Sequence, residues 1–465
     1  MSMRGFRDHS FNASVLANTL ELPILCPCGI FSTVKTANIL SWYFRRSSRR
    51  YARFDDDVGV AQLPMPLRDR QYLLYLHIPF CVVLCPFCSF HRVEFHEDRA
   101  TRYFQALRRE IELVGRSGFR FSELYIGGGT PTVLPEELIA TIHLVRGLHP
   151  VTRISVETNP DDLDYKRVLD LRESGVNRLS VGVQSFDDRL LKEIQRYDKY
   201  GSSMQIRRRL KSAYGHFDTL NVDMIFNFPH QNEASLGTDL QILTDEIGAD
   251  QVSFYPLMSA ETTRKAMNKE IGVVSYDRER LFYEMIAEHM LAAGYTRSST
   301  WCFSRETSMV DEYITEHEEY LGLGSGAFSY LAGALYASTF SINHYISLIE
   351  SGMSGIVRRS GLSRREQMRY YLLMQLFGGS LDLEAAEKRF DDRFCRDLRA
   401  ELAALRMIRA VRKSGPALCL TERGYYLWVI MMREFFSGVN KFREQMRHNI
   451  SDEHVLLPAC QISIR

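Results

Sequence analysis

The sequence predicts an α/β fold with a parallel sheet, and two observations support this. From residue 71 onward, short runs rich in apolar and β-branched residues alternate with amphipathic helical stretches, and six such units follow one another. A strand followed by a helix, repeated, is typical of a parallel sheet because the helix returns the chain to the same edge. Six units suffice for a barrel or most of one, and an open doubly wound sheet is the competing topology.

The elements can be assigned in chain order. Pro135 suits the first turn of the second predicted helix, and Gly175 closes the third. The predicted strands are 71–78, 123–126, 153–157, 178–183, 219–225 and 251–255, and helices are predicted at 98–115, 135–145 and 163–174.

The pattern changes after about residue 360. Three helices are predicted there and then a small hairpin at 406–424, an order that resembles a winged-helix module. We therefore expect an N-terminal arm (1–70), a barrel core (71–335), a linker (336–360), a C-terminal helical/winged-helix-like domain (361–450) and a tail (451–465). The arm is expected to be solvated, and a lid over the active site is the alternative.

Composition limits the environment and the partners. The 465 residues carry a formal net charge of +1, which gives no argument for a nucleic-acid partner. The nine cysteines are odd in number and uneven in spacing, so they predict reduced thiols in the cytoplasm rather than a disulfide framework. No apolar run is long enough to span a bilayer, and the first residues make a poor signal peptide. A monomer is the favoured state.

Three cysteines follow the first predicted strand with the spacing C-x3-C-x2-C. They are Cys81, Cys85 and Cys88. Three thiolates in one loop can hold an iron–sulfur cluster, which normally takes four protein ligands, so one iron would stay open for a cofactor. A zinc site is the alternative, with His77 or His91 as the fourth ligand. Cys26 and Cys28 form only a C-x-C pair, which is weak evidence for a ligand set.

Polar and glycine residues follow the later strands. The Gly127–Gly129 run ends the second strand, Glu157 the third and Gln184 the fourth, and Asp223 lies near the end of the fifth. These ends share one rim of a parallel barrel, where active sites are built. Glycines there allow close backbone approach. Carboxylates suit an ammonium group or ribose hydroxyls, and Arg196 on the next helix suits a carboxylate.

Five segments resemble one known family, the radical S-adenosylmethionine (SAM) proteins related to oxygen-independent coproporphyrinogen III oxidase. The resemblance covers about residues 70–335, and LTERGYYL extends it toward the C-terminus. The segments are YLHIPFCVVLCPFC (75–88), YIGGGTPT (125–132), VETNP (156–160), NRLSVGVQSF (177–186) and NVDMI (221–225).

The resemblance implies a 4Fe-4S cluster on the three cysteines and one SAM, with room for a second. Residues matched to the first SAM are Tyr75, Gly128, Glu157 and, in the later Gly-rich segment 322–328, Phe328. Those matched to the second are Phe87, Gly129, Thr130, Gln184, Arg196 and Asp223. No residue is assigned a catalytic role.

The implied chemistry is cleavage of SAM to a 5′-deoxyadenosyl radical that takes hydrogen from a tetrapyrrole. This needs a low-potential electron donor and anaerobic conditions. The leading expectation is the oxidative decarboxylation of coproporphyrinogen III in heme biosynthesis. The alternatives are a radical C-methyltransferase and a heme-binding chaperone without catalysis.

The sequence departs from the family pattern in three places. Phe90 stands where the oxidase has a further cysteine. The run Asn343-His344-Tyr345 does not match the His-Asn-x-x-Tyr-Trp run of the heme chaperones. Asn227-Phe228-Pro229 replaces the usual Gly-Leu-Pro. These differences predict a divergent branch and leave the substrate open.

Overall fold

Six parallel strands form the centre of the computed structural model, which describes residues 62–68, 70–258, 264–305 and 317–448. They pair side by side in chain order. Their bounds are β1 Tyr72–Ile78, β4 Phe121–Gly128, β5 Arg153–Thr158, β6 Arg178–Gln184, β7 Thr219–Phe226 and β8 Gln251–Pro256. All six strands of the sequence prediction are present.

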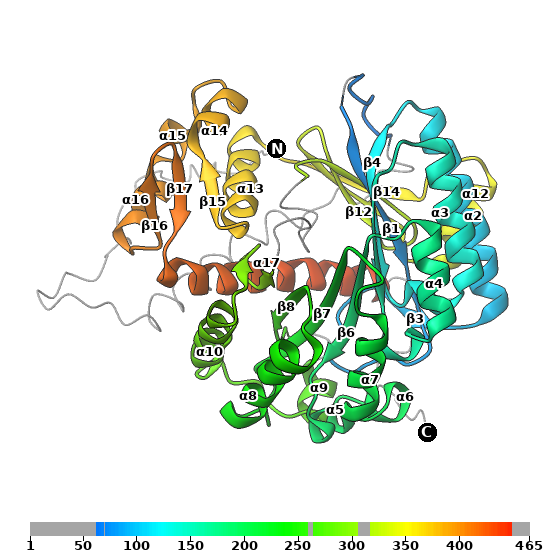
Figure 1. Ribbon diagram of the computed structural model, residues 1–465. Helices are drawn as coiled ribbons and strands as arrows, with labels where there is room; N and C mark the ends of the chain where they lie inside the picture. The colour runs from blue at the N-terminus through cyan, green and yellow to red at the C-terminus, as the bar shows by residue number, and fades with distance from the viewer. Residues whose placement is uncertain (1–61, 69, 259–263, 306–316, 449–465) are drawn as a thin grey trace, which may run out of the picture.

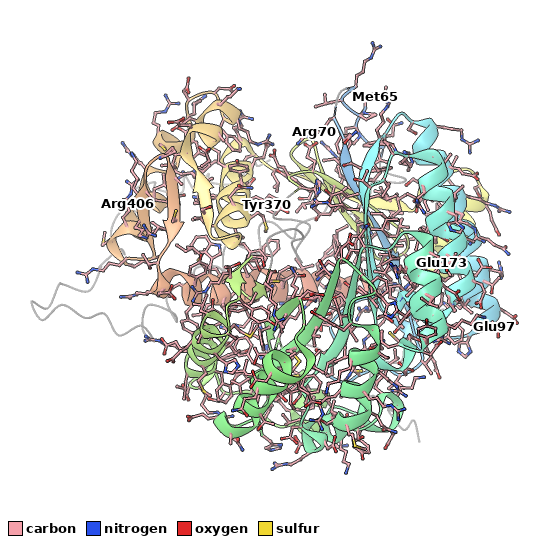
Figure 2. The ribbon with its side chains drawn as sticks, in the orientation of Figure 1. Met65, Arg70, Glu97, Glu173, Tyr370 and Arg406 are labelled. Carbon is pink, nitrogen blue, oxygen red and sulfur yellow. The ribbon has the colours of Figure 1, made fainter. Side chains whose placement is uncertain are left out.

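Helices cover the outer face of this curved sheet (Figure 1). Pro135 starts its helix as predicted, and Gly175 ends another in the left-handed conformation with φ 101°. The outer helices are α2 Glu97–Arg116, α3 Pro135–Leu148, α4 Tyr165–Ser174, α7 Ser203–Ala213, α8 Glu233–Gln241 and α10 Glu279–Ala292. Glu97 and Glu173 lie on this outer layer in Figure 2. The fold is therefore a partial (β/α)6 barrel rather than a doubly wound sheet, which would carry helices on both faces.

The sheet extends beyond the barrel to twelve strands. On one side β11 (Tyr320–Leu323) pairs parallel to β1 and is followed by antiparallel β12 (Phe328–Leu331), β13 (Ala334–Ser338) and β14 (Ile356–Gly361). On the other side, β10 (Cys302–Ser304) and β9 (Thr296–Arg297) follow β8.

Residues 336–360 were predicted to be a linker, and this is wrong. They contain the end of β13, the helix α12 (Ile342–Glu350) and most of β14. The prediction failed because no strand-and-helix repeat marks these strands, which add to the sheet edge in antiparallel order. The other domain boundaries stay predictions, and most of the 1–70 arm and all of the 451–465 tail lie outside the described residues.

The C-terminal region contains helices and a three-stranded sheet ordered β15-β17-β16. Its elements are α13 Arg364–Phe377, β15 Ser380–Asp382, α14 Leu383–Arg389, α15 Phe394–Asp397, α16 Arg399–Met407, β16 Val411–Ser414 and β17 Ala417–Leu420. The third of the helices predicted after residue 360 is two helices, α15 and α16, because the backbone leaves helical geometry at Leu398 (φ −103°, ψ 17°).

The last described element, α17 (Glu422–His448), is a 27-residue helix. It runs from the small C-terminal sheet across to the barrel (Figure 1). The sequence analysis did not anticipate this helix. It closes one side of the space above the strand ends, so the C-terminal region contributes directly to the site.

Candidate active site

A cavity of about 370 Å³ lies at the carboxyl ends of the parallel strands. Pockets of this size hold small-molecule ligands. The residues matched in the sequence to the cluster and to the two SAM molecules all line it. They are Tyr75, Cys81, Cys85, Phe87, Cys88, Gly128, Gly129, Thr130, Glu157, Gln184, Arg196, Asp223 and Phe328. The structure thus brings residues spread over 250 positions into one place, while their contacts with cofactors stay predictions.

Cys81 ends β2 (Phe80–Cys81), and Cys85 and Cys88 lie in the loop that follows. Cys81 and Cys85 are buried, and Cys88 is half-buried. Burial raises the pKa of the Cys81 thiol to about 12, so a thiolate is stable there only beside positive charge. The hydroxyl of Thr130 donates to Cys81 Sγ at 3.6 Å. These buried sulfurs fit a cluster whose irons supply that charge.

The zinc alternative needed a histidine ligand, and His77 does not fit that role. Its Nδ1 lies 2.9 Å from the hydroxyl of Tyr75, and its Nε2 lies 2.9 Å from the carbonyl oxygen of His91. Burial lowers the pKa of His77 to about 3, so the ring is neutral. Within the described ranges, no group of three or more His, Cys, Asp or Glu side chains is arranged to hold a single metal ion.

The glycine run packs against the chain that leads into the cysteine loop. The N–H of Gly129 donates to the Ile78 carbonyl (2.7 Å), and that of Thr130 donates to the Phe80 carbonyl (2.8 Å). A Cβ on Gly129 would lie 2.7 Å from the Phe80 oxygen. Gly129 is therefore required by contact with the protein's own backbone, a reason that the sequence analysis did not give.

Glu157 is held at the end of β5 by two donors. The N–H of Gly128 donates to its Oε2, and the hydroxyl of Tyr125 donates to its Oε1, each at 3.0 Å. Gly128 has φ 119°, a left-handed conformation that glycine adopts readily. The carboxylate is thus fixed at the cavity wall, in a position suited to an ammonium group.

Arg196 and Asp223, which also line the cavity, are each held by their own hydrogen bonds. Arg196 donates to Asn159 Oδ1 at 3.0 Å and, through Nη1, to Cys85 Sγ at 3.6 Å. Asp223 accepts from Ser180 (2.9 Å) and from the Asn221 amide (2.8 Å). Their carboxylate and guanidinium groups can therefore present opposite charges to one ligand.

Gln184 marks a distortion at the end of β6. Its φ is 77°, which is uncommon for a residue with a side chain, and the strand pairing with β7 shifts there. Such backbone strain is often found at functional sites.

The wall opposite the strands was not predicted from the sequence. That wall is largely aromatic, and Tyr370 lies on the side of α13 that faces the barrel (Figure 2). The lining residues that were not predicted include Arg92 beside the cysteine loop, Tyr255 of β8, Trp301 just before β10, and Tyr370, Phe435, Phe436, Phe442 and Arg443 from the C-terminal helices. The available signal was Phe435, Val439, Phe442 and Met446, which are spaced as on one face of a helix.

Comparison with known proteins agrees with this geometry. The profile of the Radical SAM superfamily matches residues 75–243. The chain is 29% identical over 373 residues to the heme chaperone HemW of Bacillus subtilis, covering 76% of this chain and 96% of that protein. It is also 29% identical over 329 residues to the oxygen-independent coproporphyrinogen III oxidase of Cereibacter sphaeroides, covering 65% and 72%.

Among solved structures, the coproporphyrinogen III oxidase HemN of Escherichia coli is similar in fold. The TM-score is 0.66 at 22% identity, and the match covers 84% of this chain and 93% of that one. Within the described residues, no helix is long and apolar enough to cross a membrane. Residues 75–243 belong to the radical SAM superfamily, whose cofactors are a 4Fe-4S cluster and S-adenosylmethionine, and the chain is similar over most of its length to heme chaperones and oxygen-independent coproporphyrinogen III oxidases.

Proposed function

We propose that this chain is a cytoplasmic radical SAM oxidoreductase that takes a hydrogen atom from a tetrapyrrole, in the oxidative decarboxylation of coproporphyrinogen III. One observation carries the proposal: the three thiols and a broad aromatic lining share one cavity. Aromatic side chains such as Tyr255, Trp301 and Phe436 suit the faces of a large ring.

The residues of the chain have separate tasks in this proposal. When bound, the cluster and SAM supply the electron and the organic radical. Cys81, Cys85 and Cys88 hold the cluster. Glu157, fixed by Gly128 and Tyr125, orients the amino group of SAM.

The surrounding protein keeps water out of the site. Tyr75 and His77 are buried, and their contact is neutral because burial raises the pKa of the tyrosine and lowers that of the histidine. Residues from α13 and α17 cover the strand ends. A reactive radical needs such protection from side reactions.

Two predicted sets of SAM contacts line the same cavity. The set matched to a second SAM includes Gln184, Arg196 and Asp223. A second SAM would be the methyl donor in the methyltransferase alternative. Equilibrium binding of radiolabelled SAM to cluster-loaded protein counts the sites, and we expect the first to depend on Glu157.

A heme chaperone is the second candidate, and the similarity to HemW over 96% of its length favours it. Phe90 also replaces the cysteine of the oxidase. In this reading the chain would bind heme in the aromatic cavity and transfer it without turning over SAM.

An anaerobic assay separates these functions. Cluster-loaded protein is incubated with SAM, a low-potential electron donor and coproporphyrinogen III, and the products are analysed by mass spectrometry. We expect 5′-deoxyadenosine and a product that has lost carbon dioxide, with neither formed by the Cys85→Ser variant. Methylated product would support a methyltransferase, and stoichiometric heme transfer without 5′-deoxyadenosine would support a chaperone. Either result would overturn the decarboxylation proposal.

A further inference from the structure

Three arginines meet where the cysteine loop contacts α17. Arg92 follows the loop, and Arg443 and Arg447 come from the helix. The Arg443 guanidinium lies 4.9 Å from the ring centre of Phe90 and 5.5 Å from that of Phe328. Arg447 donates to the carbonyl oxygen of Phe90. Residues 350 positions apart thus form one cationic cluster.

The positive charge in this cluster is concentrated and shielded from water. Arg92 is 7% exposed and Arg447 is 9% exposed. Burial and the charges of Arg443 and Arg92 lower the pKa of Arg447 to about 10. The charges of Cys88 and the buried Glu444 raise the pKa of Arg447, but they offset the lowering only in part. Buried like charges are costly, so an anion placed among them would be strongly favoured.

Arg92 offers hydrogen-bond donors that the described part of the chain does not use. Its Nη2 donates to the carbonyl oxygens of Cys85 and Cys88, the latter at 2.9 Å. Its Nε and Nη1 are buried and have no partner within the described residues. Both Arg92 and Arg443 line the cavity. Planar guanidinium groups match the two oxygens of a carboxylate.

The rest of the cavity suits the apolar body of the same ligand. Tyr255, Trp301, Tyr370, Phe435 and Phe436 line it, whereas the arginine cluster lies beside the cysteine loop. A ligand with a flat apolar ring and carboxylates on its rim would satisfy both parts. Glu157 cannot serve such a carboxylate because the charges are alike.

We propose that Arg92 and Arg443, with the positive charge of Arg447 beside them, form a binding site for a side-chain carboxylate of the substrate, which places that side chain next to the cluster. This inference rests on the proposed function in taking the ligand to be a tetrapyrrole carboxylate. The amino-acid part of SAM is the other source of the same chemistry, and the experiment distinguishes the two.

The test measures binding rather than turnover. Cluster-loaded protein is titrated under anaerobic conditions with coproporphyrin III, with its tetramethyl ester and with S-adenosylhomocysteine, following quenching of tryptophan fluorescence. The variants are Arg443→Gln and Arg443→Lys, and the exposed Lys441→Gln on the same helix is the control. Iron and sulfide content are measured for each to confirm an intact cluster.

We expect Arg443→Gln to weaken coproporphyrin III binding by about tenfold or more, which corresponds to about 1.4 kcal/mol, because a hydrogen bond between charged groups is lost. Arg443→Lys should recover part of the loss. Binding of the ester and of S-adenosylhomocysteine should be unaffected, as should all binding by Lys441→Gln.

Two results would overturn the inference. One is equal affinity of the unmodified protein for the acid and the ester. The other is a loss of S-adenosylhomocysteine binding in Arg443→Gln with porphyrin binding intact. If the unmodified protein binds neither the acid nor the ester, the proposed function itself fails, which is a distinguishable outcome.

Discussion

Each sulfur of the cysteine loop has its own surroundings. Cys81 accepts from Thr130, Cys85 lies against Arg196, and Cys88 is half-buried. The donors that face Cys81 and Cys85 stabilise negative charge on sulfur, since hydrogen bonds to a charged form favour it. The loop is therefore suited to thiolates although two of its three cysteines are buried.

The first prediction concerns these sulfurs. Cys85→Ser should lose most of its iron and sulfide and the broad visible absorption of a 4Fe-4S cluster, because two thiolates hold a cubane poorly. Iron and sulfide analysis after anaerobic reconstitution measures this. Cys395→Ser in α15 is the matched control and should keep the full content. A fully loaded Cys85→Ser protein, or zinc in place of iron, would contradict the assignment.

At the scale of elements, Asp239 joins α8 to the chain that leaves β6. Its carboxylate accepts from the hydroxyl of Ser185 (2.9 Å) and the N–H of Phe186 (2.8 Å), directly after the strained Gln184. Burial raises the pKa of Asp239 to about 7 from an ordinary value of 3.8. The helix thus fixes a strand end at the cavity through a carboxyl group that resists ionisation.

This shift predicts how stability depends on pH. Between about pH 4 and pH 7 the folded state holds a proton on Asp239 that the unfolded chain releases. The contribution of Asp239 to the free energy of unfolding therefore decreases as the pH rises. Asp239→Asn removes the titration. Its stability relative to the unmodified protein should therefore increase with pH over that range, as measured by urea unfolding.

The exposed Asp198→Asn variant is the control for this measurement. Its stability difference from the unmodified protein should stay constant over the same pH range. A constant difference for Asp239→Asn as well would show that Asp239 is ionised in the fold.

The elements that the sequence predicted are those with a regular pattern. The six parallel strands repeat with a helix after each, and parallel register places their polar ends, such as Glu157 and Asp223, at one rim. The strands β11–β14 have no such repeat. They are held partly by Glu110 of α2, a buried carboxyl that accepts from the N–H groups of Gly324 and Gly355. Such long-range contacts leave no local trace in the sequence.

The site was predictable for the same reason, and only in part. The motifs in and after β1 to β7 predicted the half of the site that the carboxyl ends of the strands form. The other half depends on α17. Its Phe436 and Arg443 line the cavity although they follow the first strand by more than 300 residues. The spacing of those residues in the sequence does not indicate which surface of the protein the helix will cover.

At the scale of the whole molecule, α17 connects the C-terminal region to the barrel through a buried ion pair. Arg433 of α17 donates to both carboxylate oxygens of Glu279 in α10, and its guanidinium lies 4.0 Å from the ring centre of Tyr276. Trp428 anchors the same helix to α13 by donating to the Leu373 carbonyl at 3.0 Å. Docking of α17 therefore controls both the stability of the assembly and the shape of the cavity.

Breaking this pair should loosen the helix. Arg433→Met leaves Glu279 buried without its cation, which should cost about 3–5 kcal/mol in the free energy of unfolding. Urea unfolding followed by tryptophan fluorescence measures the loss, and limited proteolysis of α17 reports undocking. Adding Glu279→Gln to Arg433→Met should recover part of the stability because the buried charge is gone. The exposed Lys441→Met on α17 should change little, and an equally small effect of Arg433→Met would mean that apolar contacts alone hold the helix in place.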